Sequence, residues 1–121
     1  MSSTDPAADR ARLHYDLIDA GQIDRMVELF TEDMTYHRPG YETMRGAGEL
    51  ARFYRIDRRI ERGRHRIDLV VVNDGEVVVR GDFEGVLKDG AEIRLRFADF
   101  FGTVADGRFS RRETFFFAPL T

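Results

Sequence analysis

The chain has 121 residues, a net charge of −3, no cysteine, and 42% hydrophobic residues, with ten phenylalanines. A chain of this length can form one domain with a substantial core, so we expect a single domain over residues 1–121. The lack of cysteine excludes disulfides, thiolate metal sites and cysteine nucleophiles. The negative net charge gives no support to general nucleic-acid binding. No apolar run approaches the ~20 residues of a membrane span.

The first residues give no sign of export. The stretch from Met1 to Pro6 has neither the basic start nor the apolar stretch of a secretory signal. Together with the lack of cysteine, this predicts a cytoplasmic protein. We therefore expect neither a membrane nor a nucleic acid among its partners.

Helical signals come first in the chain. Thr4 or Asp5 can cap a first helix, Pro6 suits its first position, and Gly21 ends it. A second, short helix begins near Asp24, where apolar residues again recur at helical spacing. Two short helices are therefore predicted before any strand.

A short strand and a third helix follow. Residues 34–38 read as a short strand or edge segment, stopped by Pro39-Gly40. The loop 41–46 leads into the third helix, whose apolar period continues to Ile60. Gly63 is then its expected C-terminal cap.

After Gly63 the apolar period changes from helical to alternating, as with Ile67, Leu69 and Val71. Four long strands are predicted, at residues 64–72, 76–87, 91–104 and 108–118. Each of the three turns between them ends in glycine. This order predicts an α+β domain in which three N-terminal helices pack on an antiparallel sheet of about four long strands plus a short edge strand.

The hairpin between the second and third long strands allows a prediction of register. The loop Lys88-Asp89-Gly90 fits a three-residue turn with glycine in its last position. That turn sets Asp82 opposite Arg96 and Val79 opposite Asp99. One face of the hairpin is then a ladder of opposite charges, and the other face is apolar except for Asp99.

Asp99 is the strongest candidate for a functional residue. Strand side chains alternate between faces, so Asp99 shares its face with Phe97 and Phe101. A carboxylate among aromatic side chains is either a paired structural group or a working acid or base. The two plausible loop lengths of the next hairpin place either Arg112 or Glu113 beside it.

Four segments, residues 20–24, 29–40, 44–54 and 97–101, carry a resemblance to a known family. The chain resembles the nuclear transport factor 2-like superfamily, and most closely its SnoaL-like branch, which includes polyketide cyclases and is related to ketosteroid isomerases. The resemblance implies a cone-shaped fold, a hydrophobic cavity and a homodimer packed sheet to sheet. It implies no single activity, because this fold hosts many functions.

The family's site residues are only partly kept. The protonated Asp of the isomerases, in the third sheet strand, matches Asp99. Their general base falls on Arg38, and the Tyr of their first helix falls on His14, with Tyr15 adjacent. Polyketide cyclases use an Asp in the same strand region as acid/base. Limonene-epoxide hydrolases use an Asp-Arg-Asp set, of which Arg38 and Asp99 could supply part.

We expect Asp99 and Arg38 to form the polar centre of the cavity. Burial disfavours the charged form of a carboxyl group, whereas a nearby arginine favours it. If Arg38 points into the cavity, Asp99 is an ionised base. The alternatives are a buried ion pair without chemistry for Asp99 and a place at the domain rim for Arg38. His14 is either an oxyanion donor or a core histidine.

The other histidines are expected outside the site. His37 points away from Arg38 and belongs to the surface or an interface, and His65 is expected to be exposed. Three scattered histidines lack the spacing of a metal site. We therefore expect no metal, and the expected chemistry needs no cofactor.

Further side chains could line the cavity. These candidates are Tyr15, Tyr36, Tyr41, Phe53, Tyr54, Phe83, Phe97, Phe101 and Arg112. Phe115, Phe116 and Phe117 put apolar side chains on both faces of the last strand. One face must be covered, which supports a homodimer formed through the sheet.

Seven arginines lie between residues 52 and 66. They form either a surface for RNA, phosphate or an acidic partner, or a solvated helix face interleaved with acidic residues. The negative net charge favours the solvated face.

The sequence thus predicts a cavity for a small, apolar, carbonyl-bearing molecule, with acid/base chemistry of the isomerase, cyclase or hydrolase kind. Asp99 would move a proton beside the carbonyl, and Arg38 or His14 would hold the oxyanion. The alternatives are a non-catalytic small-molecule binding protein and a dimerisation or interaction module.

Overall fold

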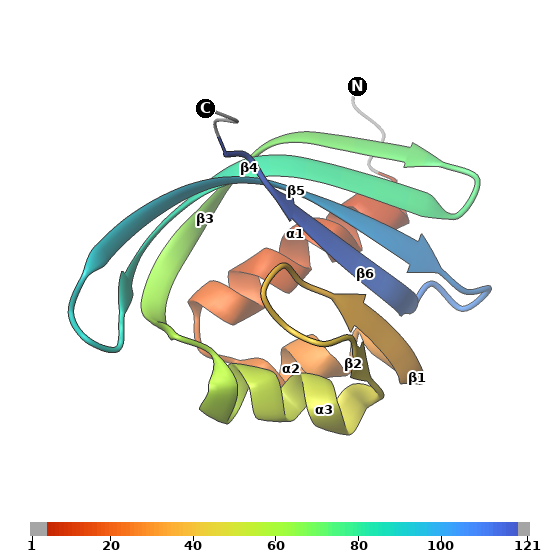
Figure 1. The fold of residues 1–121 in the computed structure, drawn as a ribbon. Coiled ribbons are helices and arrows are strands. Elements are labelled where there is room, and N and C mark those ends of the chain that lie inside the picture. The colour runs from red at the N-terminus through yellow and green to blue at the C-terminus, as the bar shows by residue number, and fades with distance from the viewer. Residues whose placement is uncertain (1–4, 119–121) are drawn as a thin grey trace.

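The computed structural model describes residues 5–118, and in it three helices lie against one face of a curved sheet (Figure 1). The helices are α1 (Pro6–Asp19), α2 (Ile23–Val27) and α3 (Ala47–Arg52), continued by a π-helical turn, η1 (Phe53–Asp57). The strands are β1 (Phe30–His37), β2 (Met44–Arg45), β3 (Ile60–Asn73), β4 (Glu76–Leu87), β5 (Glu92–Thr103) and β6 (Phe109–Phe116). None of the helices within the described range is long and apolar enough to cross a membrane.

The sheet has the strand order β2-β1-β6-β5-β4-β3. The α+β class is confirmed, but the sheet is mixed rather than antiparallel, because β1 pairs parallel to β6. The expected edge segment, β1, lies inside the sheet, with β2 outside it. This pairing joins the first strand of the chain to the last, which no local sequence pattern can reveal.

The signals at the ends of α1 are confirmed. The Asp5 carboxylate accepts a hydrogen bond from the Ala7 backbone N–H at 2.8 Å, and Pro6 occupies the first turn. Gly21 follows the helix with a φ of 73°, a conformation that favours glycine. Thr4, the other expected cap, lies outside the described residues.

The third helix is shorter than predicted. It ends through η1 at Asp57, and Arg58 is extended, with φ −64° and ψ 131°. Ile60 therefore begins β3, and Gly63 is a strand residue rather than a helix cap. The early end of the helix brings Arg58 to the edge of the interior.

Gly63→Ala is expected to lower the free energy of unfolding by about 1–3 kcal/mol. A Cβ at residue 63 would clash with Cζ of Phe83 and would lie 2.6 Å from the backbone oxygen of Glu84. Gly48→Ala is the control, because its Cβ meets nothing within 4 Å and the change favours α3 by up to ~1 kcal/mol. Urea unfolding measures the free energy of unfolding of both variants. Equal changes would show that the Phe83 ring can move aside without loss of stability.

The predicted register between β4 and β5 is confirmed. Asp82 pairs with Arg96, and Val79 pairs with Asp99. On one face, Arg96 Nη1 lies 2.9 Å from Asp82 Oδ1 in a solvent-facing ion pair. On the other face, Asp99 is fully buried beside Phe97. The sequence therefore predicted correctly which way Asp99 points.

A one-residue shift in β3 breaks the predicted alternation of this strand. The pairing with β4 shifts between Ile67 and Leu69, which marks a β-bulge. Ile67 faces the core before the shift, and Val70 and Val72 face it afterwards. Leu69 and Val71 are exposed on the other side.

A second shift decides which residue of β6 faces Asp99. Next to the turn, Thr103 pairs with Phe109. If this register continued along both strands, Asp99 would lie opposite Glu113. One residue further on, the pairing shifts, and Asp99 pairs with Thr114 instead. Neither of the two expected partners lies directly opposite Asp99. The shift nevertheless turns Arg112 inward, onto the face of Asp99.

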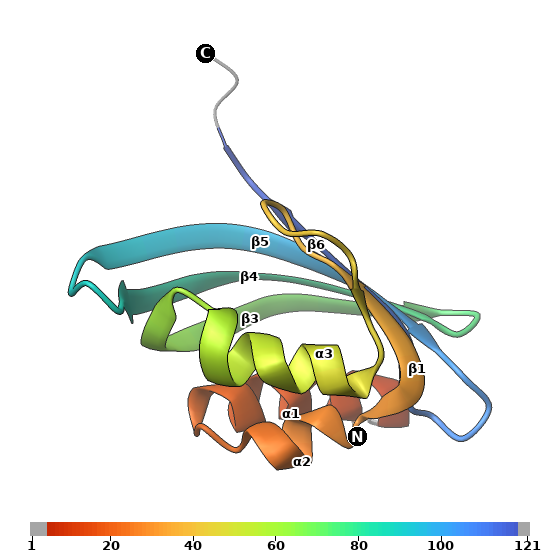
Figure 2. The same ribbon diagram turned by 60° about the horizontal axis from the view of Figure 1, so that its bottom comes forward.

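The face of the sheet away from the helices is uncovered over the described residues (Figure 2). The rings of Phe100 and Phe115 meet there, with centroids 5.5 Å apart, and Phe115 is 48% exposed. Phe116 points to the helix side and packs against the core. The end of β6 thus carries apolar side chains on both faces, as predicted. The second subunit on the uncovered face stays a prediction.

Candidate functional site

Asp99 and Arg112 form a buried ion pair between β5 and β6. Nη2 of Arg112 lies 2.9 Å from Oδ2 of Asp99, and the two side chains are 3% and 0% exposed. The Tyr15 hydroxyl donates to the same Oδ2 at 2.5 Å, and the Thr114 hydroxyl donates to Oδ1. Both carboxylate oxygens are therefore occupied by donors.

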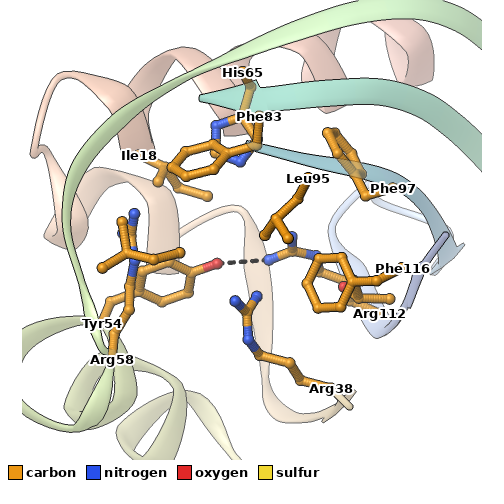
Figure 3. Close-up of a pocket in the computed structure, with 12 residues that line it drawn as sticks. Ile18, Arg38, Tyr54, Arg58, His65, Phe83, Leu95, Phe97, Arg112 and Phe116 are labelled. Atoms are coloured by element: carbon orange, nitrogen blue, oxygen red, sulfur yellow. Dashed lines mark hydrogen bonds between the residues drawn. The ribbon is translucent and has the colours of Figure 1, made fainter. Parts of the chain in front are cut away.

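Arg112 reaches past Asp99 toward the space under the sheet. Its Nη1 donates to the Tyr54 hydroxyl at 2.7 Å (Figure 3). Its guanidinium lies 4.5 Å from the ring centroid of Tyr36. Burial alone would lower the pKa of Arg112, but the Asp99 carboxylate and the nearby tyrosine hydroxyls raise this pKa well above its ordinary value. Arg112 is thus a permanent cation in a fixed orientation.

Arg38 reaches Asp99 only through other side chains. Its Nη1 donates to the Tyr36 hydroxyl at 3.0 Å, and that hydroxyl lies 2.9 Å from Oγ1 of Thr114. Because Thr114 donates its own proton to Asp99, the Tyr36 hydroxyl is the donor to Thr114. The expected direct pairing of Asp99 with Arg38 is wrong, and Arg112 holds that place.

His14 is a core residue beside this network. Burial and the charge of Arg112 lower the pKa of His14 well below its ordinary value, so the imidazole is neutral. Its Nε2 lies 3.5 Å from Nη1 of Arg112, and its Nδ1 has no hydrogen-bond partner in the described part of the chain. The neighbouring Tyr15, rather than His14, donates to Asp99.

A pocket opens beside Arg112, between α1, η1 and the sheet (Figure 3). It is lined by Ile18, Arg38, Tyr54, Arg58, Ile60, His65, Phe83, Leu95, Phe97, Arg112, Thr114 and Phe116. The enclosed free volume is about 20 Å³, and the whole hollow out to its open mouth is about 370 Å³. The enclosed part has room for about one water molecule, so a ligand must displace rim side chains. Asp99 does not line the pocket.

His65 lines the pocket, contrary to the expectation that it is exposed. Its side chain is 12% exposed, and its Nδ1 lies 2.6 Å from Oδ1 of Asp19. The other Asp19 oxygen accepts the backbone N–H of His65 at 2.7 Å. Because a carboxylate only accepts, Nδ1 carries the proton and Nε2 has a free lone pair. Burial lowers the pKa of His65, and the hydrogen bond to Asp19 opposes this shift.

Arg58 is the second residue whose position was not foreseen. It was expected on a solvated helix face, but it is 9% exposed because the helix ends at Asp57. Its guanidinium lies 5.1 Å from the ring centroid of Tyr54. Its neighbour Arg59 is exposed, as expected for the arginine-rich stretch.

The other predicted site residues divide into three groups. Those that line the pocket are Tyr54, Phe83, Phe97 and Arg112. Those buried away from it are Tyr15, Tyr36, Phe53 and Phe101. Tyr41 is exposed and packs on Phe53, with ring centroids 5.0 Å apart. Apolar residues such as Ile18 and Leu95 line the pocket without any signal in the sequence, because their residue types are those of an ordinary core.

His37 and the remaining acidic residues offer no second centre. His37 is exposed, as expected, and its Nδ1 lies 3.0 Å from the Thr43 hydroxyl. Within residues 5–118, no three His, Asp or Glu side chains cluster in the way that metal ligands do. The pocket beside Arg112 is therefore the candidate site.

Comparison with known structures supports the fold. A protein of unknown function from Burkholderia pseudomallei K96243, described as NTF2-like, is 18% identical with a TM-score of 0.85, over 94% of this chain and 92% of that one. A candidate polyketide cyclase from Pseudomonas putida KT2440 is 19% identical with a TM-score of 0.82, over 97% and 94%. An epoxide hydrolase/cyclase-like enzyme of pyran ring formation in the polyether salinomycin is 15% identical with a TM-score of 0.81, over 92% and 90%.

Sequence comparison supports the family. No functionally curated protein matches this chain. The family model of the SnoaL-like domain, however, matches residues 11–112. This match runs from the middle of α1 to the middle of β6 and includes both residues of the buried ion pair. The chain therefore belongs to the SnoaL-like domain family and has the NTF2-like fold.

Proposed function

We propose that the pocket binds a small carbonyl-bearing molecule and that the protein moves a proton at the carbon beside the carbonyl, as isomerases and cyclases do. Membership of the SnoaL-like family supports this class of function. The observation that carries the proposal is the fixed guanidinium of Arg112, which meets Tyr54 at the pocket wall and shares the pocket with His65.

Arg112 and Tyr54 would stabilise the oxyanion. Loss of a proton from carbon leaves the electron pair of the C–H bond in an enolate, with the negative charge on the carbonyl oxygen. Donors that are already fixed at that oxygen stabilise the charge without reorganising. Arg112 is fixed by Asp99, so Asp99 acts as a positioning residue in this proposal rather than as the base.

His65 would be the base. Its Nε2 makes no hydrogen bond within residues 5–118 and has a free lone pair, while Asp19 holds Nδ1. Nε2 takes the proton from carbon, and Asp19 stabilises the imidazolium that forms. Return of the proton to another atom of the enolate completes an isomerisation. Attack of the enolate carbon on a second carbonyl group of the same molecule opens that C=O π bond and gives a cyclisation, in which the new alkoxide takes the proton back from Nε2. No other reactant is needed for the isomerisation.

Exchange of the α-hydrogens of 2-tetralone for deuterium, followed by NMR in D₂O, tests this function. The wild-type protein is expected to accelerate exchange above buffer, and His65→Gln to lower the acceleration about a hundredfold or more. The rate should rise with pH through the pKa of His65, which burial places below the ordinary value of 6.5. His37→Gln, at the exposed surface, is the matched control and should exchange like the wild type.

Two results would contradict the proposal. Full exchange in His65→Gln would remove His65 from the mechanism. Binding of 2-tetralone without any exchange, seen as shifted resonances alone, would identify a non-catalytic binding protein.

A further inference from the structure

We propose that the natural ligand carries a carboxylate on an apolar, aromatic-sized body, and that Arg38 and Arg58 bind this carboxylate. The inference rests on the proposed function and names its substrate class. Three arginines line one pocket, but only Arg112 has a carboxylate partner within the described residues.

Arg38 has only weak partners for its charge. It donates one hydrogen bond, to the Tyr36 hydroxyl, and lies over the rings of Phe53 and Phe116, 5.3 and 5.2 Å from their centroids. No carboxylate oxygen of residues 5–118 lies within 4.0 Å of it. Part of its donor capacity is therefore left for a ligand.

Arg58 has fewer partners still. It is 9% exposed, and its guanidinium makes neither a hydrogen bond nor an ion pair with the described residues. Its charge has a cation–π contact with the Tyr54 ring. Burial lowers the pKa of Arg58, but an arginine remains charged at neutral pH. The guanidinium nitrogens of Arg58 have no partner among the described residues but retain contact with solvent, so an incoming anion would replace water there and pair with the charge.

Some arginines that have more access to water than Arg38 and Arg58 nevertheless have carboxylate partners. On the outer face of the sheet, half-exposed arginines that water could solvate have carboxylate partners at 2.6–2.9 Å. These pairs are Arg80–Asp68, Arg96–Asp82 and Arg111–Glu76. The chain thus has acidic residues available for pairing, but Arg38 and Arg58, unlike these three arginines, have none within the described residues.

The negative groups near the pocket are already engaged. Asp99 pairs with Arg112, and Asp19 is hydrogen-bonded to His65. No acidic residue lines the pocket. The unpaired charge therefore favours an anionic ligand, and a planar carboxylate matches the paired N–H groups of a guanidinium.

The body of the ligand follows from the remaining walls. Phe83, Leu95, Phe97 and Phe116 are apolar and line the same pocket as the two arginines (Figure 3). The enclosed volume of about 20 Å³ is too small for a ring, so a one- or two-ring ligand requires the rim side chains to move. The carboxylate would replace solvent at Arg38 and Arg58, while Arg112 remains for the carbonyl oxygen.

Isothermal titration with 1-naphthoate and its neutral isostere 1-naphthamide tests the inference. The wild-type protein is expected to bind naphthoate at least tenfold more tightly, with a preference that weakens as salt is raised. Arg58→Met and Arg38→Met should each reduce this preference about tenfold, because naphthoate binding weakens more than naphthamide binding. Arg59→Met removes a neighbouring exposed arginine and should keep the wild-type preference.

Equal affinity for the two probes, or no binding of either at millimolar concentration, would overturn the inference, and neither result depends on a variant. A preference that survives the removal of both pocket arginines in folded protein would also overturn it. Exchange of 2-tetralone without a naphthoate preference would leave the proposed function standing. A naphthoate preference without exchange of 2-tetralone would support the carboxylate site but contradict the proposed proton transfer.

Discussion

Removing either partner of the Asp99–Arg112 pair is expected to lower the free energy of unfolding by about 3–5 kcal/mol. Asp99→Leu leaves a buried guanidinium without its carboxylate, and Arg112→Met leaves a buried carboxylate without its cation. Each remaining charge has lost water and gained no full replacement. A loss of this size is a large part of the ~5–15 kcal/mol that stabilises a typical domain.

The double variant Asp99→Leu/Arg112→Met is expected to recover much of this loss, because no charge is left buried. The matched control is Arg96→Met, which breaks a pair of the same 2.9 Å distance whose side chains are 44% and 45% exposed. That change should cost less than ~1 kcal/mol. Urea unfolding followed by circular dichroism measures all four proteins. Additive losses in the double variant would mean that the two side chains do not depend on each other.

Stability is expected to fall as the pH drops below about 6.5, and His14 is expected to be a main cause. Burial and the charge of Arg112 hold the pKa of His14 well below 6.5 in the folded protein. Between the folded and unfolded pKa values, the unfolded chain binds a proton that the folded chain does not. The free energy of unfolding then falls by up to about 1.4 kcal/mol per pH unit for this one group.

His14→Phe is the variant that isolates this effect. The ring of His14 packs edge-on against Phe101 and Phe30, with centroids 5.2 and 5.6 Å away, so phenylalanine should fit the site. The variant should be close to wild type at pH 8 and lose part of the pH dependence below 6.5. His65→Gln removes the smaller, similarly directed contribution of the other histidine. His37→Gln, at the surface, should change neither the stability at pH 8 nor the loss of stability below pH 6.5. A wild-type slope in both interior variants would assign the acid sensitivity to other groups.

Some features of the fold could be predicted because they depend on neighbours in the chain. The Asp5 cap, the glycine after α1 and the loop that sets the β4–β5 register act within a few residues. The same register correctly turned Asp99 inward. The order of helices and strands, together with four short segments of sequence, suggested the family whose model matches residues 11–112.

The sequence left two candidates on the last strand, Arg112 and Glu113, for the residue beside Asp99, and could not choose between them. A single extra residue near Thr103 changes the pairing of β5 with β6, and the alternation of residue types does not mark where such a shift occurs. The shift turns Arg112 rather than Glu113 onto the face of Asp99. Tyr15 completes the group from α1, across a distance in sequence that no local rule spans.

By itself, the sequence determined the class of fold, the ends of the first helix and the face on which Asp99 lies, because capping, turn chemistry and strand alternation are local. Only the tertiary structure decided what surrounds the pocket. The early end of the third helix buried Arg58, and packing of β3 against the end of α1 joined His65 to Asp19. These contacts join segments that are distant in the sequence, so local sequence rules could not predict which residues surround the pocket.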